Sequence, residues 1–352
     1  MNRGAKTLSE IDSQPDVWAE ALRVFERRAN ELGSLWETGA FDEILFTGCG
    51  STYYAGMIGA ALLQTGTGIA ARAVSATELM LFPEMIITAQ RTTLLVCISR
   101  SGTTRETLAA ADLFRNHGGH SIVVITCDSE SPLAQTADVL LAIDAAQEQS
   151  RVQTRSFSSM VVAATALAAL FSGRDWRRLS ALPDALERLT STSMEMIEQM
   201  GRDRTITQFV FLGSGALYGA ACEAMLKMTE MAKLFTTSCG TLEYLHGPHY
   251  AADSGTRIIT LLSEGVREEE ERVLEKLRQR GLSLLTLADT NPAAKINGTH
   301  SGGDTITLTS GIPEWGRAIL YVPPLQRLCW RQAVERGFDP DNLPFDPRRT
   351  QG

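Results

Sequence analysis

A ten-residue segment of this chain occurs twice. The segment FTGCGSTYYA at 46–55 returns as FLGSGALYGA at 211–220, so that Phe46 corresponds to Phe211 and both glycines stay in register. Each copy follows an apolar run and leads into a stretch rich in small residues, a pattern typical of a strand, a tight turn and a helix. The repeat indicates that one folding unit has been duplicated within the chain.

Further apolar runs alternate with helical stretches in both halves. The expected strands are 44–46, 93–98, 121–126 and 139–143 in the first half and 209–212, 257–262, 282–287 and 305–308 in the second. Largely apolar strands that alternate with helices predict parallel sheets covered on both faces. The sequence therefore predicts the α/β class, with two tandem doubly wound parallel-sheet domains.

The expected divisions follow from this repeat. They are an N-terminal helical leader at 1–34, the first repeat at 35–175, a connecting helix at 176–204, the second repeat at 205–335 and a C-terminal tail at 336–352. In folds of this kind, ligands bind at the carboxyl ends of the strands.

Composition excludes several classes of protein. The net charge of -8 argues against a nucleic-acid partner, which would need a clustered excess of Lys and Arg. No apolar run is long enough to span a bilayer, and the most apolar one, 160–171, is expected to be a buried helix. The six cysteines are scattered without a C-x-x-C pair, so we expect a cytoplasmic protein with neither disulfides nor a zinc site.

A hydroxyl-rich turn follows the second expected strand. The sequence Ser99-Arg100-Ser101-Gly102-Thr103-Thr104 leads directly into a helix, whose free amides and positive dipole end favour an anion. It is not a Walker loop, because no Gly-Lys-[Ser/Thr] follows. The turn is either a Ser/Thr-rich helix cap without a ligand or a phosphate site. The matching turn of the second repeat, 262–266, has lost most of these hydroxyls and gained a carboxylate, which favours a phosphate site in the first repeat alone.

The first glycine turn is expected to face the same crevice. Gly50, Ser51 and Thr52 follow the first strand, and the Thr52 hydroxyl is a further candidate donor. The Gly-x-Gly pair lacks the third glycine and the acidic residue of a dinucleotide fingerprint, so NAD is rejected as a cofactor.

Three charged residues share one face of the helix after the second glycine turn. Glu223, Lys227 and Glu230 are spaced at i, i+4 and i+7. They either form a solvated, ion-paired face or lie buried with a function, and their mostly apolar neighbours favour burial.

A histidine follows in a loop. Gly247 and Pro248 end regular structure directly after His246 and present its imidazole, which suits general acid/base chemistry. Glu243, His246 and His249 have a spacing that suggests a metal site, but the Gly-Pro between them spoils helical ligand geometry. No metal is therefore expected.

These motifs resemble the tandem SIS (sugar isomerase) domain family. The resemblance covers nearly the whole chain and includes the leader at 10–15, the turn 99–104, the segment 148–157, the 223–230 helix, His246-Gly247-Pro248 and the tail at 337–341. The family includes the isomerase half of glucosamine-6-phosphate synthase, tagatose-6-phosphate ketose/aldose isomerase-like proteins, glucosamine-6-phosphate deaminases and fructosamine-6-phosphate deglycases. It implies two SIS domains of the flavodoxin-like type, a phosphorylated sugar as partner and a homodimer.

The resemblance also implies residue roles. Glu230 is similar to the base that moves a proton between C1 and C2, and His246 to the ring-opening residue, contributed by the neighbouring subunit. The expected substrate-binding residues are Gly50, Ser51, Thr52, Ser99, Arg100, Ser101, Thr104, Glu148, Gln153, Thr154, Glu223 and Lys227. Aldose/ketose chemistry needs a base over the first two carbons and a separate acid/base at the ring oxygen, with no metal or redox cofactor.

Two departures from the synthase narrow the function. The chain has Asn2 in place of the glutaminase cysteine, and the tail after Gly337 has no lysine to form a Schiff base. We expect a deaminase/isomerase that acts on an amino-sugar 6-phosphate and releases ammonia. A deglycase that cleaves a sugar phosphate from an amino acid, a ketose/aldose isomerase and a non-catalytic sugar-phosphate sensor are the alternatives.

Overall fold

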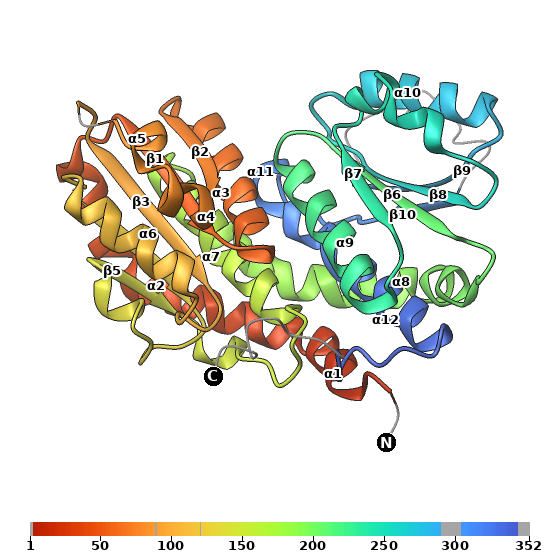
Figure 1. Ribbon diagram of the computed structural model, residues 1–352, viewed down its shortest axis with the longest axis horizontal. Helices are drawn as coiled ribbons and strands as arrows, with labels where there is room; N and C mark the ends of the chain where they lie inside the picture. Colours follow the sequence, from red (N-terminus) through yellow and green to blue (C-terminus); the bar gives the residue numbers. More distant parts are fainter. Residues whose placement is uncertain (1–2, 89, 120, 290–303, 344–352) are drawn as a thin grey trace.

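The chain folds into two open parallel sheets that lie side by side, each covered by helices (Figure 1). The computed structural model describes residues 3–88, 90–119, 121–289 and 304–343. The first sheet has the order β2 (Ala70–Ser75), β1 (Glu43–Gly48), β3 (Thr93–Ser99), β4 (Ser121–Thr126), β5 (Val139–Ala142). The second has the order β7 (Thr236–Cys239), β6 (Gln208–Gly213), β8 (Thr256–Leu261), β9 (Ser283–Ala288), β10 (Asp304–Thr307).

The two sheets have the same topology. In each, the first strand of the half lies second in the sheet, and the chain then crosses to the other side, which is the flavodoxin-like order. All strand pairs are parallel. The repeat extends to the backbone, because Gly50 has φ 57° and ψ -123° and Gly215 has φ 56° and ψ -129°. The predicted fold class is confirmed.

Helices connect and cover the strands. They are α1 (Ala5–Asp12), α2 (Gln14–Gly39), α3 (Ser51–Thr67), α4 (Ala76–Leu81), α5 (Pro83–Ile86), α6 (Arg105–Asn116), α7 (Arg155–Phe171), α8 (Leu182–Arg202), α9 (Ala216–Ala232), α10 (Arg267–Gln279), α11 (Glu314–Arg317) and α12 (Val322–Glu335). Helix α7 is apolar on nearly all sides and is buried against α2 and α3, as its sequence predicts. Within the described ranges, no helix is long and apolar enough to cross a membrane.

Helices α3 and α9, which follow the two glycine turns, pack against each other between the sheets (Figure 1). A Cβ on Gly219 of α9 would lie 2.9 Å from the Tyr54 carbonyl oxygen and 2.8 Å from Ile58 Cγ1, so only glycine permits this close crossing. Tyr54 and Gly219 are themselves repeat-equivalent positions. The crossing therefore lies on the approximate two-fold axis that relates the halves.

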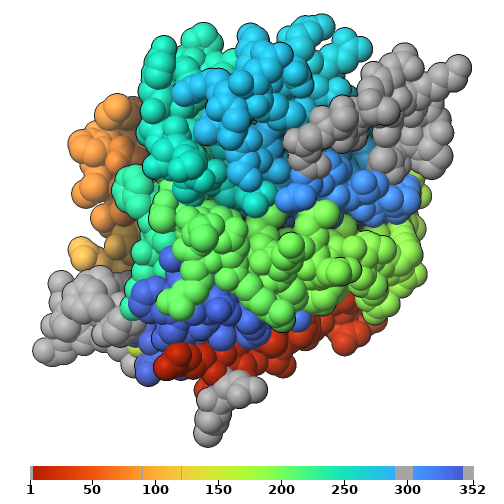
Figure 2. All heavy atoms as spheres, turned by 90° about the vertical axis from the view of Figure 1, so that its right-hand side faces the viewer, coloured from red at the N-terminus to blue at the C-terminus, as the bar shows by residue number. Residues whose placement is uncertain are grey.

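Two edge strands and the helices α4, α5, α11 and α12 were not among the sequence predictions, whereas α1 lies within the predicted helical leader. Strands β2 and β7 pair with β1 and β6 only on one side, and their mostly exposed or half-buried residues lack an apolar run. Helix α1 packs against α12, so segments near the start and the end of the described chain are in contact. Figure 2 shows the leader in red below α8 in green, with α10 above them.

Candidate active site

The hydroxyl-rich turn at 99–104 is rigidly folded at the carboxyl end of β3. The Gly102 amide donates to Ser99 Oγ at 3.2 Å, and the Thr104 and Ser99 hydroxyls lie 3.5 Å apart. Gly102 has φ 58°, and a Cβ on it would lie 2.0 Å from Ser131 Oγ. The turn thus needs glycine here, and it presents the amino end of α6 to the crevice.

The first glycine turn lies at the neighbouring strand end. Since β1 and β3 are adjacent and the chain leaves them in opposite directions, their ends form the topological switch point where ligands bind in this fold. The Thr52 hydroxyl accepts from the Cys49 amide at 2.9 Å and donates to the Cys49 carbonyl at 3.0 Å. The structure thus brings 50–52 and 99–104 to one crevice, with Thr52 bracing the turn.

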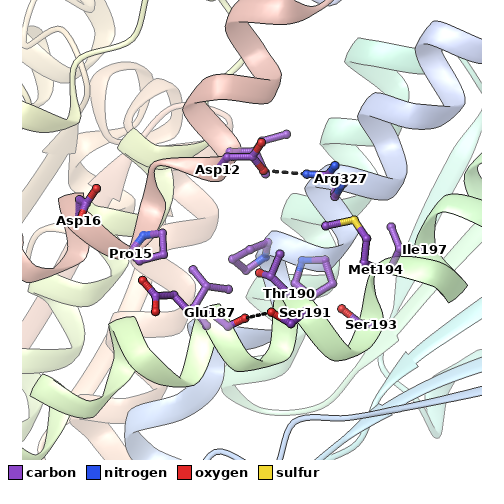
Figure 3. A pocket seen from close by; sticks show the side chains of 14 residues that line it. Asp12, Pro15, Asp16, Glu187, Thr190, Ser191, Ser193, Met194, Ile197 and Arg327 are labelled. Atoms are coloured by element: carbon purple, nitrogen blue, oxygen red, sulfur yellow. Dashed lines mark hydrogen bonds and ion pairs between the residues drawn. The ribbon is translucent and has the colours of Figure 1, made fainter.

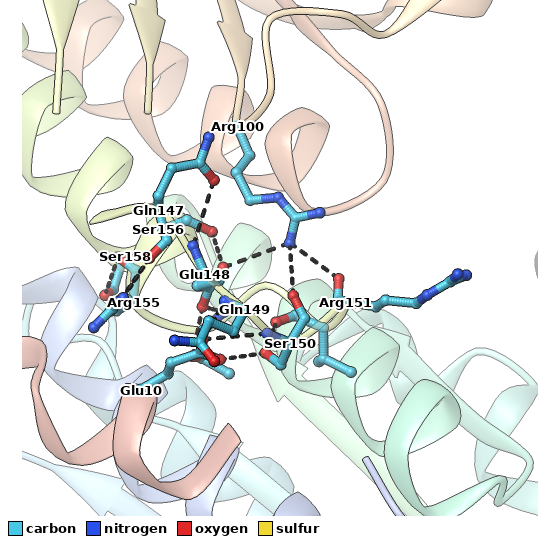
Figure 4. A network of polar contacts seen from close by, with 12 residues as sticks. Glu10, Arg100, Gln147, Glu148, Gln149, Ser150, Arg151, Arg155, Ser156 and Ser158 are labelled. Atoms are coloured by element: carbon cyan, nitrogen blue, oxygen red, sulfur yellow. Dashed lines mark hydrogen bonds and ion pairs between the residues drawn. The ribbon is translucent and has the colours of Figure 1, made fainter. Parts of the chain in front are cut away.

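A loop after β5 forms the next wall of the crevice (Figure 4). The fully buried Glu148 carboxylate accepts from the Thr154 amide and hydroxyl, both at 2.6 Å, and from Ser156 Oγ. Arg100 lies 3.7 Å from this carboxylate and donates to the Arg151 carbonyl at 3.1 Å. Burial raises the pKa of Glu148, although the hydrogen bonds to its carboxylate and the charge of Arg100 each lower that pKa.

Arg100 therefore links the hydroxyl-rich turn to this wall. Its side chain is about a quarter exposed, so part of the guanidinium still faces solvent. Gln153, also in the wall, has a buried Oε1 without a hydrogen-bond partner among the described residues. A buried acceptor of this kind is suited to a ligand donor.

The leader holds the wall in place. Glu10 of α1 is buried, and its carboxylate accepts from the Gln149 amide at 2.5 Å, the Ser150 amide at 3.2 Å and the Ser150 hydroxyl. The sequence analysis did not assign Glu10, Ser150 or Ser156 a role. Their signal was weak, because single polar residues far apart in sequence reveal no contact.

The charged face of α9 is largely buried. Lys227 is fully buried, with its Nζ 2.5 Å from Glu230 Oε2 and 3.4 Å from Glu223 Oε1. Glu223 is also fully buried, whereas the Glu230 side chain is 34% exposed. The spacing left open whether this face is solvated or buried, and the structure shows that Glu223 and Lys227 are buried.

Electrostatics separate the three groups. Burial raises the pKa of Glu223 to about 8, and the negative charge of Glu230 adds to this increase. The positive charge of Lys227 lowers the same pKa but does not cancel the effect of burial. Burial alone would lower the pKa of Lys227, but the two carboxylates more than offset it and raise that pKa. Near neutral pH, Lys227 is therefore cationic and Glu223 holds a proton for much of the time.

The helix crossing directs this face toward the first-half crevice. Glu223 interacts with Ser51, and Leu226 Cδ2 would lie 3.9 Å from a Cβ on Gly50. Contacts of Gly219 with Ile58 and of Glu223 with Ser51 mean that α9 runs antiparallel to α3. Glu230 lies about two turns beyond Glu223, or roughly 10 Å along the axis, and so extends past the start of α3 on the crevice side.

His246 lies elsewhere in the same chain. Strand β7 begins at Thr236 beside the start of β6, six residues after Glu230, so Glu230 lies toward the amino edge of the second sheet. His246 comes after β7, beyond the carboxyl edge, and is exposed. A single chain therefore does not join His246 to Glu230.

Other potential sites have a different character. A cavity of about 550 Å³ between α1, α8 and α12 contains the Asp12–Arg327 ion pair at 2.7 Å and has none of the predicted site residues among its lining (Figure 3). Among the residues that the structure describes, no group of His, Cys, Asp and Glu is arranged to hold a metal ion. Arg348 and Arg349, in the lysine-free part of the tail, lie outside the described residues.

Comparison with known protein families finds a SIS domain in the first half of the chain. Residues 41–173 match the SIS domain model. The chain is 29% identical over 363 residues to the glutamine–fructose-6-phosphate aminotransferase (isomerizing) of Pseudomonas aeruginosa, covering 95% of this chain and 56% of that protein. It thus spans about half the length of several curated relatives that it matches. AgaS of Streptomyces coelicolor, a candidate D-galactosamine-6-phosphate deaminase, is 29% identical, with 96% and 91% covered.

Solved structures share the fold of the whole chain. Glucosamine-6-phosphate deaminase of Thermotoga maritima aligns with a TM-score of 0.73 and 28% identity, over 92% of this chain and 97% of that one. Tagatose-6-phosphate ketose/aldose isomerase of Escherichia coli aligns with a TM-score of 0.85 and 23% identity, over 96% and 95%. The resemblance to tandem SIS proteins is confirmed.

Proposed function

We propose that this SIS-domain protein is an enzyme that converts an amino-sugar 6-phosphate into a ketose phosphate and ammonia. The observation that carries the proposal is the α9 face, where a buried lysine holds the carboxylate of Glu230 on the helix that meets the first glycine turn of the other half. The relatives named as deaminases, at 28% and 29% identity over almost the full chain, support the same reaction class.

In this proposal the substrate's phosphate binds at the amino end of α6. Ser99, Ser101, Thr104 and the loop amides donate to it, and Arg100 adds a charge-assisted bond. Gln153, Thr154 and Glu148 line the part of the pocket that holds the sugar hydroxyls. The sugar carbons then lie toward α9, where Glu230 removes the C2 proton and returns it at C1. Water then adds to the resulting C2 imine, so that the C–N bond breaks, ammonia leaves and the C2 ketone forms.

Lys227 is a positioning residue for Glu230. Its ammonium bonds the Glu230 carboxylate at 2.5 Å, and its burial fixes that carboxylate in place. Glu223 completes the buried pair and, with a raised pKa, limits the negative charge that faces the substrate.

The second acid/base group is proposed to come from a second copy of the chain. The exposed His246 lies between Leu242 and Tyr250, and Tyr250 is 79% exposed. A second apolar group, Leu81, Phe82 and Met85, is exposed on α4 and α5 of the first half. Exposed apolar groups of this size suit a protein interface, and a homodimer would bring His246 to the partner's crevice.

Location in the cytoplasm is also proposed. No disulfide joins the six cysteines, all of which lie within the described residues, and four of them are buried. Cysteines that are not joined in disulfides suit a reducing compartment.

Two related reactions compete with deamination. A deglycase would use the same Glu230 and His246 on a sugar phosphate joined to an amino acid, and a ketose/aldose isomerase would use them without loss of nitrogen. A sensor would bind the sugar phosphate without turnover. The buried charge pair on α9 favours an enzyme, because such a pair costs stability and simple binding does not need it.

A substrate panel separates these functions. The purified protein is incubated with glucosamine 6-phosphate, galactosamine 6-phosphate, fructosamine 6-phosphates of several amino acids and tagatose 6-phosphate. Ammonia, free amino acid, ketose phosphate and aldose phosphate are measured in each reaction, and aldose phosphate formed from tagatose 6-phosphate identifies an isomerase. Ammonia release from an amino-sugar phosphate supports the proposal; release of amino acid alone identifies a deglycase, and binding without any product identifies a sensor.

A further inference from the structure

The second sheet has its own counterpart of the hydroxyl-rich turn. Thr47 and Leu212 are repeat-equivalent, and they pair with Cys97 and Thr260 respectively. Counting on from these partners makes Gly265 the equivalent of Gly102 and Glu264 the equivalent of Ser101. The turn at 262–266 therefore stands where the first half has its proposed phosphate site, and it precedes the 13-residue helix α10.

A carboxylate of the chain itself occupies this second turn. Glu314 Oε1 accepts from the Ser263 hydroxyl at 2.6 Å, from the Glu264 amide at 2.6 Å and from the Gly265 amide at 3.5 Å. These are the kinds of donors, a hydroxyl and loop amides, that the first turn offers to a phosphate. Glu314 comes from α11, about fifty residues later in the chain.

A cavity adjoins this carboxylate. It measures about 590 Å³, lies between the second glycine turn and α3, and is lined by Glu314, Trp315, Arg174 and Arg317 among others. This volume is in the range of small-molecule sites. The cavity is thus the counterpart of the first-half crevice, with α3 in the place of α9.

The helix face over this cavity lacks the acid/base residues. The positions equivalent to Glu223, Lys227 and Glu230 on α3 are Ile58, Leu62 and Thr65, and the last two line the cavity. The second crevice therefore has the same surrounding elements as the first without its proton-transfer groups.

A buried cation lies beside the occupied turn. Arg317 is 4% exposed, bonds Glu264 at 2.7 Å and lies 3.3 Å from Asp289, while its Nε has no hydrogen-bond partner among the described residues. Removing the Glu314 carboxylate would leave the Ser263 hydroxyl and the Glu264 amide without their acceptor.

We propose that the second turn is a latent phosphate-binding site that Glu314 occupies as an internal substitute for the ligand. Glu314 thereby restricts phosphosugar binding to the first crevice, where the acid/base groups lie. Loss of the Glu314 carboxylate opens the second crevice to inorganic phosphate and to sugar phosphates. This specificity role rests on the proposed function, whereas the latent site itself does not.

Trp315 lines the second crevice, so an emission change that depends on this tryptophan reports on that crevice. Inorganic phosphate is titrated into the full chain and into the Glu314→Ala and Glu314→Ala/Glu264→Ser variants, and tryptophan emission and Tm are followed. The second substitution restores the serine that the first turn carries and removes a carboxylate that would repel the anion. We expect saturable emission changes and a phosphate-dependent rise in Tm in both variants, larger in the double variant.

Matched controls make the result specific. Glu314→Gln keeps an oxygen that accepts the same three bonds, so its phosphate affinity at this site should be at least about tenfold weaker than that of the double variant. Trp315→Phe in the double variant should abolish the emission change while the rise in Tm remains. The proposal is overturned when folded Ala variants show no more response than the unsubstituted chain, or when unfolded ones are not rescued by phosphate. An equal response of the unsubstituted chain also overturns it.

A phosphate response separates this proposal from the proposed function. If amino-sugar phosphates are not turned over but the Glu314 variants gain phosphate binding, the catalytic proposal fails and the latent site stands. If amino-sugar phosphates are turned over but the Glu314 variants gain no phosphate binding, the latent site fails and the catalytic proposal stands.

Discussion

The two crevices of this protein have one backbone plan and opposite chemistry. In the first, the hydroxyls of the turn after β3 bond to one another, and the facing helix α9 carries a buried lysine between two carboxylates. In the second, the turn after β8 is filled by Glu314, and the facing helix α3 is apolar. Duplication supplied two sites, and side-chain changes on both walls left one of them suited to catalysis.

The largest difference between the crevices should appear at Glu230 and its counterpart Thr65. Glu230→Gln keeps the bond from Lys227 but removes the base, so kcat should fall by about 10²–10⁴-fold with sugar-phosphate affinity nearly unchanged. Steady-state kinetics and calorimetric titration with the substrate measure the two effects. Thr65→Ala on α3 is the control and should leave kcat as it was. Unchanged turnover in Glu230→Gln would remove this residue from the mechanism.

Lys227 and Leu62 compare the two helix faces in stability. Lys227→Met leaves Glu223 and Glu230 without their cation in a buried site, and should lower the free energy of unfolding by about 3–5 kcal/mol. Leu62→Met conserves volume at the equivalent position and should cost less than about 1.5 kcal/mol. Denaturant unfolding provides both values. Equal losses would mean that the buried pair contributes nothing beyond packing.

Gly102 and Gly265 compare the two turns. Gly102→Ala combines a positive φ with a clash against Ser131 and should cost about 1–3 kcal/mol and weaken phosphate binding. Gly265→Ala meets only Glu314 Oε2, at 3.6 Å, and should stay within about 0.5 kcal/mol. Thermal unfolding with and without phosphate checks both. A neutral Gly102→Ala would show that the first turn is less constrained than the contacts indicate.

The smallest effect concerns pH and the pair Glu223 and Ile58. Because the folded-state pKa of Glu223 is raised to about 8, the folded state binds a proton that the unfolded state has lost between pH ~4.5 and ~8. Its contribution to stability therefore falls as pH rises through that window. Glu223→Gln should flatten the decline of Tm between pH 5 and 8. Ile58→Val should leave the dependence of Tm on pH unchanged. A profile that does not change in Glu223→Gln would contradict the raised pKa.

The fold was predictable because its signals are local and repeated. Buried strands such as Thr93–Ser99 are continuous apolar runs, and the two glycine turns announce the strand-to-helix transitions. Strands β2 and β7 were missed because edge strands are half exposed and need no such run. Helix α12 was missed because its burial depends on contacts with α8 and α9, which its own sequence does not show.

The first crevice was predictable in part, for a related reason. The turn 99–104 and the spacing on α9 are contiguous in sequence, and the structure brings Ser99, Thr52, Glu148 and Lys227 to one region. Long-range polar partners were not predictable: the bond of Glu10 to Ser150 and that of Glu314 to Ser263 join residues that no periodicity connects. His246 remains a prediction, since its part in catalysis depends on a second chain.

The hydrogen bonds of Glu10 to the loop after β5 have a consequence for folding during synthesis. Helix α1, which carries Glu10, is itself capped by residues near the other terminus: Asp339 accepts from the Gly4 amide at 2.8 Å, and Asp341 accepts from the Thr7 amide at 2.9 Å. During synthesis the first half emerges long before these two aspartates. We therefore expect the nascent first half to lack a settled sugar pocket, and binding competence to arise only after residues 339–341 have left the ribosome and bonded the first turn of α1.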